Sequence, residues 1–235
     1  MKRTPHTVYS VEALVQYLAS NLIRHGYYHY FTGRIPAQKS PAAVDAKLLE
    51  RYHANLDKFS RARRKKKGLA NVAYVRLGRE FILLATDGNH VIYEEHSLLD
   101  LRRRPIRLYG YSIGAGKGHD GKHHASVRIA DEPFRELVAY FEERAVHRTA
   151  EQLAEELRQV PFARFARVRR QLLKLLRLVN EHRRTAGFQT IPYAALHLKR
   201  EIVPVFNVVS DRQDADGMNF TDARRAGVAG VIAAA

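Results

Sequence analysis

The sequence predicts an α+β fold, with a mainly antiparallel sheet in its N-terminal half and a helical C-terminal half. Two changes of pattern support this prediction. After Gly68 the apolar residues recur with a period of two, and from Asp131 onward they recur with a helical period. The hydrophobic content of 46% is sufficient for a folded core. We expect one domain over residues 1–209, with its sheet part at about 1–130 and its helical part at about 131–209, and a loosely ordered tail at 210–235.

The first predicted element is an amphipathic helix over residues 10–25. Ser10 can cap its first turn and Gly26 can end it. The apolar residues that share one face of this helix are Val11, Leu14, Val15, Leu18 and Leu22. A strand is expected next, over Tyr27 to Ile35, because aromatic residues alternate there with polar ones.

A second helix is expected to begin at Ser40 and Pro41, because proline suits the first helical position. We expect this helix to run to Gly68. Its apolar face consists of Val44, Leu48, Leu49, Tyr52, Leu56 and Phe59. Three short strands follow in the prediction, at Asn71–Leu77, Arg79–Thr86 and Val91–Glu94, the last two joined by a turn at residues 87–89.

The remaining elements are two strands and three helices. One strand is expected over Pro105–Ile113 and another over His124–Ile129, with a glycine-rich stretch between them. The helices are expected at 131–145, at Thr149–Arg158 with Thr149 and Gln152 in capping-box positions, and at about 164–186 before Gly187. A short mixed segment at 190–206 ends the predicted domain.

The charge balance indicates a polyanionic partner. Forty Lys and Arg residues against 24 Asp and Glu give a net charge of +16, which excludes a compact acidic enzyme. Without a polyanionic partner, these positive charges would repel one another. Nucleic acid, RNA or DNA, is the first expectation, and an anionic membrane or an acidic protein is the alternative. No apolar run approaches the roughly 20 residues of a membrane span, so we expect a cytoplasmic protein without a membrane partner.

Three clusters carry much of the positive charge, and we expect them to contact phosphates. The first is Arg61, Arg63, Arg64, Lys65, Lys66 and Lys67, and the second is Arg102, Arg103, Arg104 and Arg107. The third is a basic arc on the last long helix, made of Arg164, Arg167, Arg170, Lys174, Arg177 and Arg184, well separated from an apolar arc that runs from Phe165 to Val179. A solvated surface without a partner is the alternative interpretation of the first and third clusters.

The glycine-rich stretch resembles a nucleotide-binding loop only superficially. Residues 116–122 match the spacing G-x-x-x-x-G-K, but His123 stands at the Ser/Thr position and a strand is predicted where a helix is required. We therefore exclude an ATP or dinucleotide site. The loop could instead hold a phosphodiester with its backbone amides and with Lys117 and Lys122, or it could be a simple hairpin loop.

A nuclease is the rival hypothesis, with His123 and His124 beside the glycine-rich loop as catalytic candidates. A metal-free ribonuclease needs a base, an acid and cations, which His29 or His124, Tyr28 and Lys122 could supply. Tyr140 could serve as the nucleophile of a metal-dependent enzyme, but the required His-hydrophobic-His pair is incomplete because Ser126 follows Ala125.

The sequence places only broad limits on the cofactor and on the cellular system in which the protein acts. Cysteine is absent, which excludes disulfides, thiol nucleophiles and thiolate zinc sites. We predict no metal site and no cofactor, unless the protein is a nuclease that uses a divalent metal. We expect a role in a mobile-element, defence or ribonucleoprotein system, and a structural subunit of a larger nucleoprotein complex is the third hypothesis.

Overall fold

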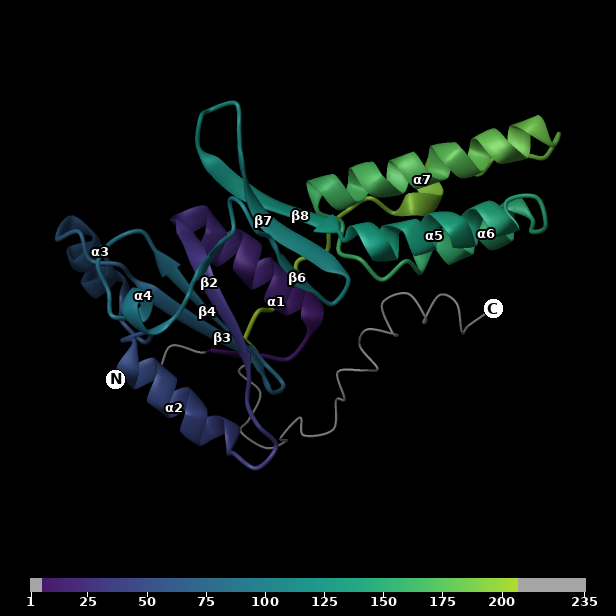
Figure 1. The fold of residues 1–235 in the computed structure, drawn as a ribbon. Helices are drawn as coiled ribbons and strands as arrows, with labels where there is room; N and C mark the ends of the chain where they lie inside the picture. Colours follow the sequence, from purple (N-terminus) through teal and green to yellow (C-terminus); the bar gives the residue numbers. More distant parts are fainter. Residues whose placement is uncertain (1–5, 207–235) are drawn as a thin grey trace. The chain divides into compact units, whose positions relative to one another are not determined.

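The computed structural model describes residues 6–206 and confirms an α+β fold. Its described residues form two compact units (Figure 1). The first unit consists of residues 6–106, 113–126 and 203–206, and the second of residues 107–112 and 127–202. The predicted tail at 210–235 lies outside the described residues.

The first unit is built on a five-stranded sheet with the order β1-β3-β4-β2-β5. Its strands are β1 (Thr7–Val8), β2 (Tyr27–Arg34), β3 (Val72–Leu77), β4 (Glu80–Thr86) and β5 (Leu99–Asp100). All neighbours pair antiparallel except β1 and β3, which are parallel. The predictions for β2, β3 and β4 are confirmed, whereas β1 and β5, of two residues each, carry too little pattern to be recognised in the sequence.

The first helix is confirmed, although it changes its winding along the way. The α-helix α1 (Val11–Tyr17) continues as a π-helical segment (Leu18–Leu22) and a 3-10 turn (Ile23–His25). The Ser10 side chain accepts a hydrogen bond from the Ala13 amide, and Gly26 ends the helix with a φ of 91°. The predicted apolar face is buried at all its positions except Val11, which is partly exposed.

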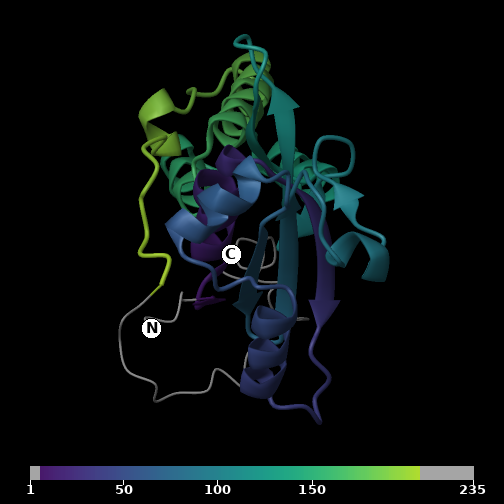
Figure 2. The ribbon, with the colours of Figure 1, turned by 90° about the vertical axis from the view of Figure 1, so that its left-hand side faces the viewer.

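Helices cover both faces of this sheet. On one face, Tyr52 and Ile92 form a cluster with Val72, Tyr74 and Leu83 of the central strands. Side chains of α2 (Pro41–Arg51) pack against this cluster, and Ile92 belongs to α4 (Ile92–Glu95). Figure 2 shows α1 and α4 on opposite sides of the sheet. Because both faces are covered, β3 is buried at every position except Arg76, and β4 is buried over residues 82–85.

The single helix predicted over 41–68 is wrong. The chain instead forms α2 and a second helix, α3 (Lys58–Lys66), and reverses between them where His53 has a φ of 49°. The Asp57 carboxylate starts α3 by accepting hydrogen bonds from the Phe59 and Ser60 amides. Because this break changes the phase of the helical pattern, Phe59 is 76% exposed instead of lying in the core.

The strand predicted at Val91–Glu94 is also wrong, because this segment is the helix α4. The His90 imidazole accepts a hydrogen bond from the Ile92 amide at the start of that helix. Consequently the residues 87–89 do not connect two strands, and the tight connection lies between β3 and β4 at Gly78, whose φ is 56°. Four alternating residues are too few to distinguish a strand from a helical turn.

A second, three-stranded sheet has the order β6-β7-β8, and each of its strands contributes residues to both units. Its strands are β6 (Ile106–Leu108), β7 (Tyr111–Lys117) and β8 (His123–Ile129). The single strand predicted over 105–113 is wrong, because Tyr109 and Gly110 both have positive φ and turn the chain. The first four residues of the glycine-rich stretch, 114–117, belong to β7, and residues 118–122 form the loop. The strand predicted after this loop is confirmed.

The second unit is helical, as predicted for this part of the chain. Its helices are α5 (Asp131–Arg144), α6 (Ala150–Arg158), α7 (Ala166–Thr185) and a 3-10 turn (Tyr193–Leu196). The capping box of Thr149 and Gln152 is confirmed, and Gly187 follows α7 with a φ of 78°. Figure 1 shows α7 lying alongside α5. None of the described helices is long and apolar enough to cross a membrane.

Candidate nucleic-acid interface

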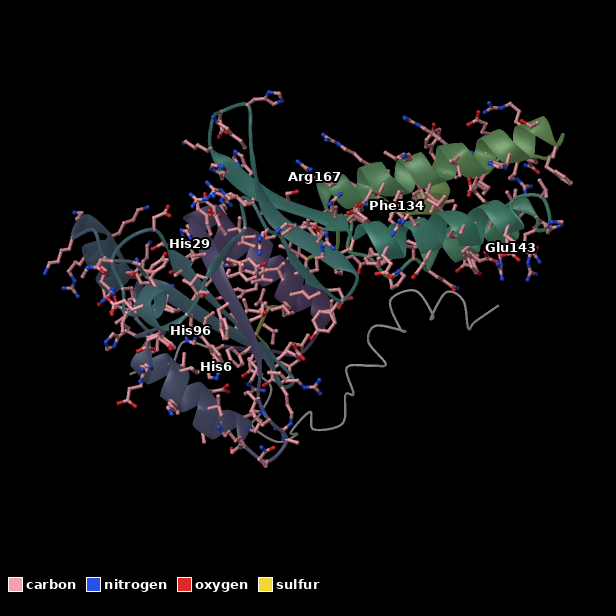
Figure 3. The ribbon with its side chains drawn as sticks, viewed as in Figure 1. His6, His29, His96, Phe134, Glu143 and Arg167 are labelled. Carbon is pink, nitrogen blue, oxygen red and sulfur yellow. The ribbon has the colours of Figure 1, made fainter. Side chains whose placement is uncertain are left out.

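An exposed row of cations follows one side of α7. Arg167, Arg170, Lys174 and Arg177 succeed one another at intervals of three or four residues, and all four are exposed. Within the described part of the chain, none of the four forms an ion pair. We call these four residues the α7 row. Figure 3 labels Arg167 at the start of α7 and shows nitrogen-tipped side chains along the edge of the helix that lies away from α5.

The opposite side of α7 is core. The buried residues on this side are Val168, Leu172, Leu175, Leu176 and Val179, each with an exposed fraction of 0%. The separation of basic and apolar arcs that the sequence predicts is therefore present in the folded helix. Packing of the apolar arc holds the helix in place and keeps the α7 row in solvent.

Two other members of the predicted arc have different surroundings. Arg164 precedes the helix and is buried, with its guanidinium donating hydrogen bonds to the backbone carbonyls of Val160, Phe162 and Leu196. The Arg164 guanidinium therefore stabilises the second unit and is not available to an external anion. Arg184 is exposed, but Glu181, the only carboxylate on α7, lies between it and the α7 row.

The first cluster lies on α3 except for Lys67, which follows the helix; with Lys58, α3 contains six cations and no carboxylate in nine residues. Arg63, Lys65, Lys66 and Lys67 are exposed, whereas Arg61 and Arg64 are half-buried. The Arg64 guanidinium donates to the Ala70 carbonyl, with its Nη2 at 2.9 Å. Hydrogen bonds from the Ser60 hydroxyl and from backbone amides lower the pKa of the Asp57 carboxyl to about 2, so the N-terminal cap of α3 is charged at neutral pH.

The second cluster is divided by a carboxylate. Arg102 lies 2.8 Å from Asp100 through its Nη2 atom, and its hydrogen bonds to that carboxylate raise the pKa of the guanidinium. Arg103, Arg104 and Arg107 are exposed, and none of them forms an ion pair with a described residue. Three of the four predicted residues are therefore available to an external anion.

In the loop between β7 and β8, several backbone amides form hydrogen bonds within the loop. The Gly118 amide donates to the Lys122 carbonyl at 2.7 Å, and the Gly121 amide donates to the Gly118 carbonyl. The Lys122 amide donates to the Asp120 carboxylate, which also accepts from the His124 imidazole at 2.8 Å. These three amides are not free to hold a phosphate, so the predicted contribution of the loop reduces to the exposed side chains of Lys117 and Lys122.

The structure joins one predicted histidine to partners that the sequence analysis did not identify. His29 on β2 donates from Nε2 to Asp87 at 2.8 Å, and the Arg102 guanidinium lies 3.5 Å from the same carboxylate. Asp87 follows β4 and Asp100 belongs to β5, so three segments distant in sequence meet here. The pairing of β2 with β4 is irregular beside His29, where such a bulge changes the direction of a side chain.

Tyr28 connects this group to a second histidine. The Arg102 guanidinium lies 5.0 Å from the centre of the Tyr28 ring. The centre of the His123 ring lies 5.6 Å from the centre of the same Tyr28 ring. We call His29, Asp87, Arg102, Tyr28 and His123 the His29 cluster. Two of the predicted catalytic histidines thus lie in one region of the first unit. A turn-forming Asp directly after a strand was the only sequence signal for Asp87.

Tyr140 does not have the surroundings of an exposed nucleophile. It lies on α5 in the second unit, is 6% exposed, and has the Arg144 guanidinium 3.9 Å from its ring centre. Burial raises the pKa of its hydroxyl. His123 and His124 belong to the first unit, so the predicted combination of a tyrosine nucleophile with these histidines has no support from the described contacts.

Comparisons with known proteins give no further guidance. No family model matches the chain, and neither curated proteins nor solved structures yield a match. Within residues 6–206 there is no group of three or more His, Asp or Glu side chains arranged to hold a metal ion. The charge and geometry of the surfaces described above therefore carry the functional interpretation.

Proposed function

We propose that this protein binds nucleic acid through the phosphate backbone, with the α7 row as its principal contact. The observation that carries the proposal is a row of four exposed cations that have no carboxylate partner within residues 6–206, on a helix whose other side is core. The row extends for about 15 Å, at a rise of about 1.5 Å per residue. Cations in this arrangement release counterions from several successive phosphates, which provides most of the affinity of non-specific binding.

The apolar side of α7 distinguishes this proposal from membrane binding. A helix that lies in a membrane surface inserts its apolar side between lipids. In this protein that side is fully buried by protein, so only the charged side of α7 is presented to a partner. A surface of charge alone favours a polyanion such as nucleic acid over insertion into a bilayer.

Each unit by itself offers further cations for phosphate contacts. On the first unit these are the exposed cations of α3, Arg103, Arg104, Lys117 and Lys122, and on the second unit Arg107. Arg164 is excluded from it by burial, and the charge of Arg102 is offset by Asp100. The proposal places the protein in the cytoplasm, in a mobile-element, defence or ribonucleoprotein system, and a structural subunit of a nucleoprotein complex would use the same surfaces.

Fluorescence anisotropy with labelled RNA and DNA tests the proposal over a range of salt concentrations. Each phosphate contact contributes about −0.9 to the slope of log affinity against log salt on duplex DNA, or about −0.7 on a single strand. The α7 row by itself therefore predicts a slope of about −3 to −4. A slope near zero would contradict the proposal.

A charge-matched pair of variants tests the assignment to α7. Arg170→Glu with Lys174→Glu should abolish binding, because it reverses the centre of the α7 row. Lys39→Glu with Lys47→Glu produces the same change in net charge at two exposed positions outside every cluster, and it should retain most of the affinity. Equal losses in the two double variants would show that only the bulk charge matters and would refute the assigned surface.

The His29 cluster supports a second candidate function, the cleavage of RNA without a metal. Asp87 orients the His29 imidazole through Nε2, and its Nδ1 has no partner among the described residues. That nitrogen can take the proton of a ribose 2′-hydroxyl, whose oxygen then attacks phosphorus, while protonated His123 gives a proton to the leaving 5′-oxygen. Arg102 would stabilise the charge on phosphorus. Asp87 and Asp100 offset the positive charge of Arg102, and for this reason we place cleavage second to binding.

Incubation of labelled RNA, in EDTA and separately in Mg²⁺ or Mn²⁺, tests the second candidate. Cleavage in EDTA should yield 2′,3′-cyclic phosphate ends and should be lost in His29→Ala. The matched control is His124→Ala, because His124 forms a similar pair with Asp120 outside the His29 cluster. Intact RNA under all conditions, or cleavage that survives His29→Ala and His123→Ala, would exclude the candidate.

A further inference from the structure

Phe59 is a large aromatic side chain without a place in the core. It lies in the first turn of α3 and is 76% exposed. Its amide donates a hydrogen bond to the Asp57 carboxylate at 2.8 Å, so the N-terminal cap fixes the position of its backbone. Figure 3 shows the side chains of α3 reaching away from the sheet of the first unit.

The charge around Phe59 distinguishes it from an ordinary exposed apolar residue. Arg63 and Lys66 follow it at i+4 and i+7, so all three lie on one side of α3, and all three are exposed. Ala62, the only other apolar residue of this helix, lies on the same side. The exposed side of α3 therefore presents one aromatic ring next to cations, with no carboxylate among them.

We propose that Phe59 stacks on an unpaired base of single-stranded nucleic acid while Arg63 and Lys66 contact the adjacent phosphates. The inference rests on the proposed function and adds the class of nucleic acid that α3 recognises. An aromatic ring beside cations is the combination that single-strand binding surfaces use, because every base has a face for stacking. Stacking by Phe59 adds to the affinity of α3 for nucleic acid a contribution that the charge of the helix alone would not provide.

The geometry of the partner favours a single strand over a duplex. In a duplex the faces of the bases are stacked on one another, and only their edges reach the grooves. A ring on a helix surface can reach a base face only where the strand is unpaired. A membrane is disfavoured because α3 contributes one large apolar side chain, whereas interfacial helices present a continuous apolar side.

The absence of tryptophan from the chain provides a direct experiment. Phe59→Trp introduces a single tryptophan at the proposed contact, whose emission can be excited separately from that of the tyrosines. Titration with an oligo(dT) or oligo(U) of 20 nucleotides should quench its emission, with an affinity close to that of the unchanged protein. A blunt duplex of the same length should leave the emission unquenched. Vesicles of phosphatidylcholine and phosphatidylserine should cause no blue shift.

An affinity measurement complements the fluorescence. Phe59→Ala should weaken single-strand binding by about tenfold, with the slope of log affinity against log salt unchanged, because the phosphate contacts remain. Tyr9→Ala is the matched control, since Tyr9 is also an exposed aromatic residue of the first unit, at 53%, but does not lie on α3. Far-UV circular dichroism verifies that both variants are folded.

The outcomes separate this inference from the proposed function. Salt-dependent single-strand binding that Phe59→Ala leaves unchanged, without quenching in Phe59→Trp, would overturn the stacking contact and leave backbone binding standing. Equal quenching by the single strand and the duplex would overturn the preference for unpaired bases. No salt-dependent binding of any nucleic acid would overturn both proposals. A blue shift with vesicles in the absence of quenching by oligonucleotides would replace this inference with membrane insertion.

Discussion

The guanidinium of Arg183 donates a hydrogen bond from Nη1 to the backbone carbonyl of Ala145 at 2.5 Å. It also donates to the carbonyls of Arg148 and Gln189, and it is only 2% exposed. Arg183 thereby attaches the end of α7 to the segment between α5 and α6. Its neighbour Arg184 is exposed. Two adjacent arginines, identical in the charge count, therefore have different roles.

Replacement of Arg183 should destabilise the protein, whereas replacement of Arg184 should not. Arg183→Met leaves three carbonyls without their donor in a buried site, which we expect to lower the free energy of unfolding by about 2–4 kcal/mol. Arg184→Met should change it by less than about 0.5 kcal/mol. Urea denaturation followed by circular dichroism measures both, and equal effects would contradict the structural role of Arg183.

Asp45 should be essential for the attachment of α2 to the sheet. Its buried carboxylate accepts hydrogen bonds from the Tyr74 hydroxyl at 2.5 Å, from Arg76 Nε at 2.9 Å and from His6 Nε2 at 3.0 Å. Asp45→Ala leaves the half-buried guanidinium of Arg76 uncompensated, and we expect a loss of about 3–5 kcal/mol in the free energy of unfolding. Glu50→Ala, on the exposed side of the same helix, is the control and should have little effect.

The same carboxylate should make stability sensitive to acid. Burial by itself would raise the pKa of Asp45, but the hydrogen bonds from His6, Arg76 and Tyr74 outweigh it, so the pKa lies below its usual value of 3.8. The stabilisation is then complete above about pH 4 and is lost as the pH falls through the lowered pKa. Urea denaturation between pH 7 and pH 2.5 should show a smaller acid-induced loss in Asp45→Ala than in the unchanged protein. Parallel curves would contradict this assignment.

Removal of the carboxylate on α7 should strengthen the binding of nucleic acid. Glu181 repels phosphates between Arg177 and Arg184, so Glu181→Gln should raise the affinity a few-fold. If Arg184 then gains a phosphate contact, the salt slope should steepen by about one. Glu136→Gln makes the same change in charge at an exposed position on α5 and should have a smaller effect. An affinity that falls or stays constant in Glu181→Gln would argue against the α7 row.

Local patterns predicted α7 and its two arcs because helical period and capping depend on residues within one or two turns. The same reasoning failed where a distant or irregular contact decided the outcome. The phase of the apolar residues placed Phe59 in the core, but the reversal at His53 moved it to the surface. Charge placed Arg164 on the basic arc, but the carbonyl of Leu196, 32 residues away, helps to hold it inside.

By itself the sequence determined the α+β fold class, most helix ends and the three concentrations of positive charge, because each depends on neighbouring residues or on composition. Only the tertiary structure decided which of those cations face solvent and that His29 pairs with Asp87, 58 residues further along the chain. The physical reason is that burial and hydrogen bonding depend on which segments meet after folding. An arginine buried among carbonyls and an arginine in water are written with the same letter in the sequence, but their side chains contribute differently to the free energy of folding.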